Sequence, residues 1–249
     1  MTAEANRAFL VEVTDLNSGY GNSIVLRDVT MRAPKEKITV ILGTSGCGKT
    51  TLLKNMIRLY DSWSGSIKLF GEEITNMDEP EFNTILKKIG VLFQNSALLN
   101  SIPILDNIAI PLEQHTDLSG NMIRRLVDIK LRLVGLGDAK YKMPSELSGG
   151  MRKRAALARA IALDPPLLFC DEPSAGLDPV TAEGLDRLIL RMRDELGMTV
   201  VLVSHTVSSI RRIADNLVYL DHGRVLFHGS PKAAKKCRVK QIEEFFDKG

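Results

Sequence analysis

The amino-acid sequence predicts an α/β fold with a largely parallel sheet and an inserted helical segment. Short apolar strands and helices alternate in the last third of the chain, an order that is typical of parallel sheets. A glycine-rich turn at residues 43–50 joins a buried strand to a helix. A run of helical segments at about 95–158 interrupts this alternation. Because no linker-like stretch divides the chain, we expect one domain that carries an inserted subdomain.

Length and composition favour a globular protein of the cytosol. Of the 249 residues, 44% are hydrophobic and 25% charged, which is typical of a soluble domain. No stretch approaches the roughly 20 consecutive apolar residues of a membrane-spanning helix. The start, Met1–Arg7, does not have the pattern of a secretory signal. We therefore expect a protein that cannot cross a bilayer by itself.

Charge and cysteine content argue against two further classes. The net charge of +3 is small for a protein that binds nucleic acid through bulk charge, so we expect no nucleic-acid partner. The three cysteines, Cys47, Cys170 and Cys237, are far apart and form no C-x-x-C pair. This spacing argues against a disulfide framework or a zinc site, and a reducing compartment fits it.

The first third of the chain predicts strands. Four segments are short, apolar or β-branched, and bounded by Gly, Pro, Asn or Asp: Leu10–Leu16, Ile24–Met31, Ile38–Leu42 and Ser66–Phe70. The run over 38–42 is continuously apolar, which indicates a strand buried on both faces. A further strand-like run, Ile89–Phe93, ends just before Gln94.

Capping residues mark the helices in the middle of the chain. Asp78 precedes Glu79 and Pro80, and we expect it to cap a helix that runs to about Lys88. Ser119 likewise precedes a helical segment, which ends at Gly135. The apolar residues of that segment at helical spacing are Ile123, Val127, Leu131 and Val134.

The last third predicts a strand, a helix and another strand. Leu167–Cys170 is a short apolar run, and Thr199–Val203 is a strand of the buried type. Between them, Asp178 and Pro179 open a helix that Gly197 closes. The apolar face of this helix consists of Leu185, Leu188, Ile189, Met192 and Leu196.

Residues 43–50 match the phosphate-binding pattern G-x-x-x-x-G-K-[ST] in full. Glycines let backbone N–H groups point into a concave anion site, and the helix N-terminus adds partial positive charge. Lys49 can reach the β- and γ-phosphates, and the Thr50 hydroxyl can bind Mg²⁺. A glycine-rich turn without a ligand is the alternative. We expect the nucleotide to contact Gly43, Thr44, Ser45, Gly46, Cys47, Gly48, Lys49 and Thr50, with Cys47 as a tolerated small residue rather than a redox switch.

Two acidic residues follow the apolar run that starts at Leu167. Asp171 and Glu172 lie where the carboxyl end of a strand borders the ligand-binding crevice of α/β sheets. We expect Asp171 to hold Mg²⁺ through its water shell and Glu172 to polarise an attacking water as general base. Alone, the pair can equally cap the segment that begins at Pro173. Together with the phosphate loop, it indicates a hydrolytic site.

Three single residues fall where a nucleotide site can use them. Gln94 follows a strand, and its amide can contact both Mg²⁺ and the attacking water. His205 follows the strand over 199–203 and can hydrogen-bond a γ-phosphate. Tyr20 lies in a glycine turn and can stack on an adenine. Each has a structural alternative: a polar strand end for Gln94, a hydrogen-bonded core residue for His205 and a packing residue for Tyr20.

A second candidate anion site precedes a basic helix. Leu147, Ser148, Gly149 and Gly150 stand directly before Met151 and the helix that follows it. A serine and two glycines at a helix N-terminus can bind phosphate. The alternative is that Ser148 is an N-cap beside a glycine hinge.

Taken in order, these residues resemble the nucleotide-binding subunit of an ATP-binding cassette (ABC) transporter. The matching positions are Tyr20, Gly43–Thr51, Gln94, Leu147–Gly150, Leu167–Glu172, Ser174–Asp178 and His205. The resemblance implies a P-loop NTPase fold with a RecA-like core, a largely parallel sheet, an N-terminal antiparallel β subdomain and an inserted helical subdomain. It implies a single domain over residues 1–249, with the core at about 1–94 and 159–230, the helical subdomain at about 95–158 and a tail at 231–249.

The resemblance also implies hydrolysis of ATP by a homodimer. Two copies pack head to tail, and each ATP lies between the phosphate loop of one copy, with Thr51 included, and Ser148, Gly149 and Gly150 of the other. Asp178 lies at the interface and couples the two sites, and it can cap its own helix at the same time. The implied Mg²⁺ ligands are Thr50, Gln94 and Asp171. The implied catalytic residues are Lys49, Gln94, Glu172 and His205, and the cofactors are ATP and Mg²⁺.

Integral-membrane permease subunits are the partners that this family implies, with a peripheral location on the cytoplasmic side of the inner membrane. The apolar segment Leu98–Ile104 lies in the region that receives a short cytoplasmic helix of the membrane subunit in this family. The same residues can fill the core of the insert, and we expect some of each.

Met151 and the helix after it resemble one branch of the family. Most members carry Gln at this position, whereas this version is similar to the Mla/MCE-type ATPases, which energise phospholipid movement between bacterial membranes. The ending Arg238–Gly249 also resembles that branch. The similarity implies a small cytoplasmic accessory subunit and an MCE-type lipid-binding protein as further partners. The alternative is the ATPase of an importer for a polar solute such as an amino acid or an ion.

Residues 231–249 carry six basic and three acidic side chains. The net charge of this tail, +3, equals that of the whole chain. We interpret this basic tail either as a solvated end or as a docking segment for a partner. We expect its removal to spare folding.

Overall fold

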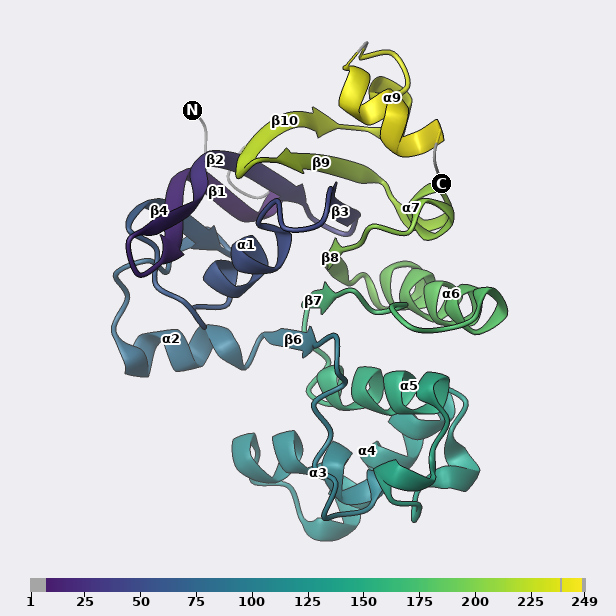
Figure 1. Cartoon of the computed structure of the whole chain (residues 1–249). Coiled ribbons are helices and arrows are strands. Elements are labelled where there is room, and N and C mark those ends of the chain that lie inside the picture. Colours follow the sequence, from purple (N-terminus) through teal and green to yellow (C-terminus); the bar gives the residue numbers. More distant parts are fainter. Residues whose placement is uncertain (1–7, 238, 248–249) are drawn as a thin grey trace.

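The structure, a computed structural model, describes residues 8–237 and 239–247, and these residues form two sheets (Figure 1). The first sheet is antiparallel, in the order β2(Ser23–Pro34), β1(Phe9–Tyr20), β4(Ser64–Leu69) and β5(Glu72–Glu73). It confirms the expected N-terminal antiparallel sheet. Met1–Arg7, on which the expected lack of a secretory signal depends, lie outside the described residues. So do Arg238, Lys248 and Gly249 of the tail.

The second sheet is largely parallel, as predicted. Its order is β10(Arg224–Gly229), β9(Asn216–Asp221), β3(Ile38–Gly43), β8(Thr199–Val203), β7(Leu167–Asp171) and β6(Ile89–Leu92). Only β10 and β9 pair antiparallel. Strands β3, β7 and β8 are buried along their whole length, which is why their sequences are continuously apolar. Since these strands run the same way, the segments that follow them emerge at one edge of the sheet.

Helix α1 (Lys49–Met56) packs between the two sheets (Figure 1). Leu52 and Leu53 are fully buried in one apolar cluster with Val13 of the first sheet and Phe169 of the second. Full burial of one such side chain contributes roughly 1.5–3 kcal/mol. Contact with both sheets therefore fixes the start of α1 and the glycine-rich turn before it.

The helical insert follows β6. After α2 (Glu79–Leu86) and β6, the chain forms α3 (Ile104–His115), α4 (Gly120–Leu133), the short turns η2 (Gly137–Ala139) and η3 (Pro144–Glu146), and α5 (Gly149–Ala160). Asp78 caps α2 as predicted, since its side chain accepts a hydrogen bond from Glu81 N–H at 2.9 Å. Helix α4 begins after Ser119, and Gly135 beyond its end has the positive φ, 72°, that favours glycine there.

Helices α5, α6 (Pro179–Leu196) and α7 (Val207–Ile213) pack on the second sheet away from α1. One apolar cluster joins Leu157 of α5, Ile189 of α6 and Ile210 of α7 with Val40 and Leu202 of the sheet. These helices therefore cover the face of the second sheet opposite α1. Among the described residues, none of the helices is both long and apolar enough to span a membrane.

The tail folds back onto the core instead of ending in solvent. It forms α8 (Pro231–Ala234) and α9 (Lys240–Asp247), seen in yellow beside β9 and β10 (Figure 1). Ile242 of α9 is only 2% exposed, and the ring of Phe245 meets Tyr219 edge-on at 5.8 Å between centroids. The interpretation as a solvated end is therefore wrong for these residues. Because apolar side chains of the tail complete the core, its removal is now expected to destabilise the fold.

Candidate active site

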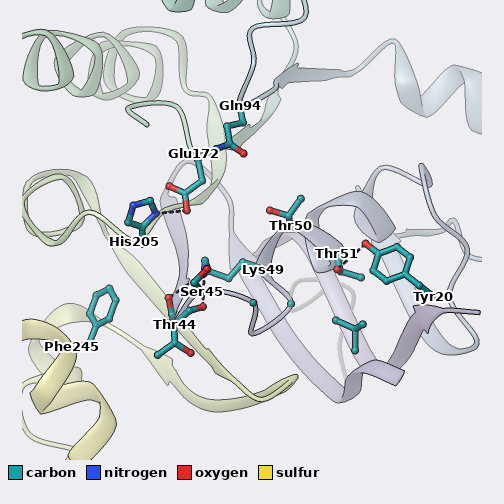
Figure 2. Close-up of a pocket in the computed structure, with 14 residues that line it drawn as sticks. Tyr20, Thr44, Ser45, Lys49, Thr50, Thr51, Gln94, Glu172, His205 and Phe245 are labelled. Atoms are coloured by element: carbon teal, nitrogen blue, oxygen red, sulfur yellow. Dashed lines mark hydrogen bonds and ion pairs between the residues drawn. The ribbon is translucent and has the colours of Figure 1, made fainter. Parts of the chain in front are cut away.

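A pocket of about 640 Å³ opens where β3, β6, β7 and β8 end (Figure 2). Its walls come from segments far apart in the sequence, which the parallel sheet brings to one edge. Most of the expected nucleotide-site residues line it. The full lining is Tyr20, Val25, Gly43, Thr44, Ser45, Gly46, Gly48, Lys49, Thr50, Thr51, Gln94, Glu172, His205 and Phe245.

The glycine-rich turn forms the floor of this pocket. Gly48, the N-cap of α1, has a φ of 106°, a conformation that favours glycine. A Cβ there would lie 2.7 Å from Leu26 Cδ2, and a Cβ on Gly43 would lie 2.0 Å from the Leu220 carbonyl oxygen. Glycine is thus required at both positions by conformation and by space. The turn presents the free N–H groups of the α1 N-terminus to the pocket, an arrangement that binds anions.

Lys49 lies across this turn. Its side chain is largely buried, and its ammonium donates hydrogen bonds to the Gly43 and Thr44 carbonyl oxygens at 3.1 and 2.8 Å. Cys47 is also buried, and burial raises the pKa of its thiol above the ordinary value. A protonated, buried thiol is unreactive, which agrees with the interpretation of Cys47 as a tolerated small residue.

The hydroxyl of Thr50 meets the carboxylate of Asp171. Thr50 Oγ1 donates to Asp171 Oδ1 at 3.1 Å, joining the start of α1 to the end of β7. Asp171 is only 4% exposed, and burial raises the pKa of its carboxyl, although the hydrogen bond from Thr50 opposes this. A divalent cation at this pair would favour the charged carboxylate, so the donor set suits Mg²⁺. No group of three or more His, Cys, Asp or Glu side chains is placed to hold a metal within residues 8–237 and 239–247.

Glu172 and His205 face each other across the ends of β7 and β8 (Figure 2). His205 Nδ1 lies 2.7 Å from Glu172 Oε1, and the imidazole is 61% exposed. The other carboxylate oxygen, Oε2, is buried and has no hydrogen-bond partner in the described part of the chain. Glu172 also has a positive φ of 46°, an uncommon conformation for a residue with a side chain. The imidazole thus fixes the orientation of a carboxylate that lines the pocket, where Glu172 can act as a base.

Gln94 and Tyr20 lie on two other sides of the pocket. Gln94 follows β6 and points toward Glu172 (Figure 2). Tyr20 ends β1, and its hydroxyl forms a 3.0 Å hydrogen bond with Thr51 Oγ1 at the start of α1. Its ring is nearly half exposed, and Tyr60 contacts it edge-on. The pocket can therefore take an aromatic base at one end and a phosphate chain at the other.

The structure does not bring Ser148, Gly149, Gly150 or Asp178 into this pocket. Ser148 caps α5 by accepting a hydrogen bond from Met151 N–H at 3.3 Å. A Cβ on Gly150 would lie 2.3 Å from Thr181 Cγ2, so the glycine lets α5 touch the first turn of α6. Asp178 caps that turn, with hydrogen bonds from Val180 and Thr181 N–H at 3.1 and 3.0 Å. Within one chain, Ser148, Gly149 and Asp178 are exposed outside the pocket, whereas Gly150 is buried against α6.

Two lining residues were not expected from the sequence, Val25 and Phe245. Val25 lies on β2 without any motif around it. Phe245 lies on α9 and reaches the side of the pocket that holds Thr44 and His205 (Figure 2). The only signal for Phe245 was its place in a short apolar pair within a basic tail.

Comparison with known families and proteins gives a consistent result. The family described as ABC transporter matches residues 26–175. The intermembrane phospholipid transport system ATP-binding protein MlaF of Escherichia coli K12 is 40% identical over 244 residues, which cover 98% of this chain and 91% of that protein. The protein named "Probable ribonucleotide transport ATP-binding protein mkl" of Mycobacterium leprae is 42% identical over 237 residues, which cover 95% of this chain and 68% of that protein.

Solved structures share the fold. A dimeric ATP-binding cassette in a post-hydrolysis state, bound to ADP and Pi, superposes with a TM-score of 0.81 at 28% identity over 88% of this chain and 98% of that one. The protein cbiO1 of Clostridium perfringens, part of the ABC transporter complex cbiONQ, superposes with a TM-score of 0.83 at 27% identity. The superposition covers 96% of this chain and 99% of that one.

Proposed function

Because this chain belongs to the ABC transporter family and is an ATP-hydrolysing subunit, we propose that it powers the movement of phospholipids between bacterial membranes. The observation that carries the catalytic part is the pair of side-chain contacts at one sheet edge, Thr50 with Asp171 and Glu172 with His205. The observation that supports the lipid substrate is similarity to MlaF along nearly the whole of both chains.

The residues of the pocket have complementary roles in this proposal. The turn of residues 43–50 binds the triphosphate through its N–H groups, Lys49 neutralises the β- and γ-phosphates, and Tyr20 contacts the base. Thr50, Asp171 and Gln94 would hold Mg²⁺, which neutralises charge on the β- and γ-phosphates. Glu172 accepts a proton from the attacking water, and His205, hydrogen-bonded to Oε1, orients that carboxylate and contacts the γ-phosphate.

A second copy of the chain completes each site. Ser148, Gly149 and Gly150 lie outside the pocket of their own chain. Ser148 and Gly149 are exposed, as is Asp178, while Gly150 is buried. The N-terminus of α5 can bind phosphate, and a head-to-tail dimer places it over the nucleotide of the other copy. The dimeric arrangement of the similar cassette with ADP and Pi supports this assembly.

We propose that the transport complex contains several partner proteins. Integral-membrane permease subunits hold the ATPase at the cytoplasmic side of the inner membrane, and the exposed apolar side chain of Leu99 contributes to their docking site. A small accessory subunit and an MCE-type lipid-binding protein complete a lipid system. The name of the mkl relative favours a second candidate, the ATPase of a transporter for a polar solute such as a nucleotide.

Isolation of the intact complex from membranes distinguishes the two candidates. We expect permease subunits, an MCE-type protein and bound phospholipid to copurify with the full-length chain. A periplasmic solute-binding protein in place of the MCE-type protein, with no bound lipid, would contradict the lipid function and favour the polar solute.

A further inference from the structure

Helix α5 holds the loop that carries Gln94 with two cationic side chains. Lys153 Nζ donates a hydrogen bond to the Gln94 carbonyl oxygen and lies 3.5 Å from the Glu172 carbonyl oxygen. Six residues later on the same helix, Arg159 donates to the carbonyl oxygens of Ser96 and Ala97 at 3.0 and 2.7 Å. The loop over residues 94–97, here termed the Gln94 loop, is thus bound to α5 at three of its four carbonyl groups.

The backbone of the Gln94 loop needs such support. Ser96 and Ala97 have φ values of 63° and 51°, a left-handed conformation that costs free energy for any residue with a Cβ. Two such residues in succession persist only where surrounding contacts fix them. The hydrogen bonds from Arg159 and Lys153 supply those contacts, and they set the direction in which the loop leaves β6.

Lys153 is buried in an unusual position for a lysine. It is 6% exposed, and burial lowers the pKa of its ammonium while the charge of Asp171 acts in the opposite direction. An ammonium this buried requires partners. Within the described part of the chain, its partners are two main-chain oxygens, one in the Gln94 loop and one at Glu172. The same side chain therefore touches both of the segments that carry the catalytic residues on this side of the pocket.

Helix α5 also makes a rigid connection to the surface for the second copy. Ser148, its N-cap, precedes Lys153 by little more than one helical turn. At the other end, Gly90 of β6 lets the helix approach closely, because a Cβ there would lie 2.4 Å from the Ala160 carbonyl oxygen. Lys153 therefore links the helix that begins at Ser148 to the Gln94 loop and to Glu172.

We propose that Lys153 is a positioning residue, which transmits contact between Ser148 and the second copy's nucleotide to Gln94 and Glu172. The proposal rests on the head-to-tail dimer of the proposed function. Lys153 touches neither nucleotide, and it acts by fixing the relative positions of two main-chain segments. Loss of its ammonium leaves the phosphate loop intact but lets Gln94 and the Glu172 carboxylate move apart.

The test compares steady-state hydrolysis of ATP by the full-length chain and its variants. Lys153→Met keeps the length of the side chain and removes the charge and the donor; we expect kcat to fall at least about tenfold and KM for ATP to stay within about threefold. Lys153→Arg, which keeps both, is expected to restore kcat to within about threefold of the original. The matched control is Lys130→Met, at an equally buried lysine that pairs with Asp164 and does not contact the Gln94 loop. Its kcat is expected to stay within about twofold.

A double-mutant cycle with Gln94→Ala tests the route of the effect. If Lys153 acts in part through Gln94, the double variant loses less activity than the product of the two single losses, whereas the effects of Lys130→Met and Gln94→Ala multiply. An unchanged kcat in Lys153→Met, or effects of Lys153→Met and Gln94→Ala that multiply, would overturn the proposal. If Lys153→Met does not fold, Lys153→Gln takes its place in the cycle with the same two outcomes.

The Glu172→Gln variant distinguishes a wrong role for Lys153 from a wrong active site. An original chain that hydrolyses ATP, with Glu172→Gln inactive, supports the active site whatever Lys153→Met does. If the Glu172→Gln variant keeps full turnover, Glu172 is not the general base, and the positioning role of Lys153 fails with that assignment.

Discussion

His205 Nδ1 lies 2.7 Å from Glu172 Oε1, so the imidazole and the carboxylate act as one unit at the ends of two neighbouring parallel strands. The imidazole orients one oxygen of Glu172, while the buried Oε2 has no partner in residues 8–237 and 239–247. The hydrogen bond to the imidazole orients the carboxylate, and a general base for water requires such a fixed orientation.

Replacement of His205 by Ala should lower kcat for ATP about 100-fold, because the carboxylate loses its orienting partner and the γ-phosphate loses a donor. The Kd for ATP should stay within about threefold, since the phosphate loop is unchanged. Single-turnover hydrolysis and nucleotide-binding titrations measure the two quantities. His115→Ala, at an exposed histidine that ends α3, is the control and should match the original.

Lys49→Ala should weaken ATP binding. The ammonium replaces its hydrogen bonds to Gly43 and Thr44 by contacts with two phosphates, and a charged hydrogen bond contributes about 1.5–3 kcal/mol, or about 10–150-fold in affinity. Equilibrium titration with labelled ATP checks this. Lys35→Ala, at an exposed lysine paired with Glu36 far from the loop, should leave the Kd unchanged. Equal affinities for all three proteins would refute the role of Lys49.

Ser148→Arg should lower turnover while ATP affinity of the isolated subunit stays within about twofold, because Ser148 lies outside the pocket of its own chain. The control is Ser119→Arg, which places the same bulk at the N-cap of α4, where the serine side chain makes no capping bond. If Ser148→Arg weakens binding to the isolated subunit instead, the assignment of Ser148 to the second copy's nucleotide fails.

Most of the site was predictable because its chemistry lies directly after apolar strands. Asp171, Glu172 and His205 each follow a continuously apolar run, and parallel pairing necessarily brings those ends together. The helix boundary at Asp78 was predictable for a local reason, since its side chain caps the next turn. Helix α4 also begins after Ser119, although that side chain makes no capping bond.

The contributions of Phe245 and Lys153 could not be predicted from local pattern. Phe245 lies in a tail rich in lysine, and its ring contacts Tyr219, which is distant in sequence, beside the pocket. Lys153 lies in a run of basic residues that by itself indicates a solvated helix face. Its burial results from the approach of α5 to β6, which depends on the absence of a side chain at Gly90.

Ile242→Ala should reduce the free energy of unfolding by about 2–4 kcal/mol, because the side chain is 2% exposed and its loss leaves a cavity under α9. Chemical denaturation followed by circular dichroism measures the change. Lys240→Ala, on the exposed face of the same helix and paired with Glu244, should change stability by less than about 0.5 kcal/mol. Equal stability of the Ile242 variant and the original would restore the view of the tail as a solvated end.

Hydrolysis and assembly of Glu172→Gln in the full-length chain address the proposed mechanism as a whole. The amide keeps the size of the side chain and cannot accept a proton from water, so we expect turnover to fall at least about 100-fold. ATP binding should persist, and the ATP-bound variant should elute as a dimer in size-exclusion chromatography while the nucleotide-free variant does not. Turnover equal to that of the original chain, or an ATP-bound variant that stays monomeric, would contradict the mechanism.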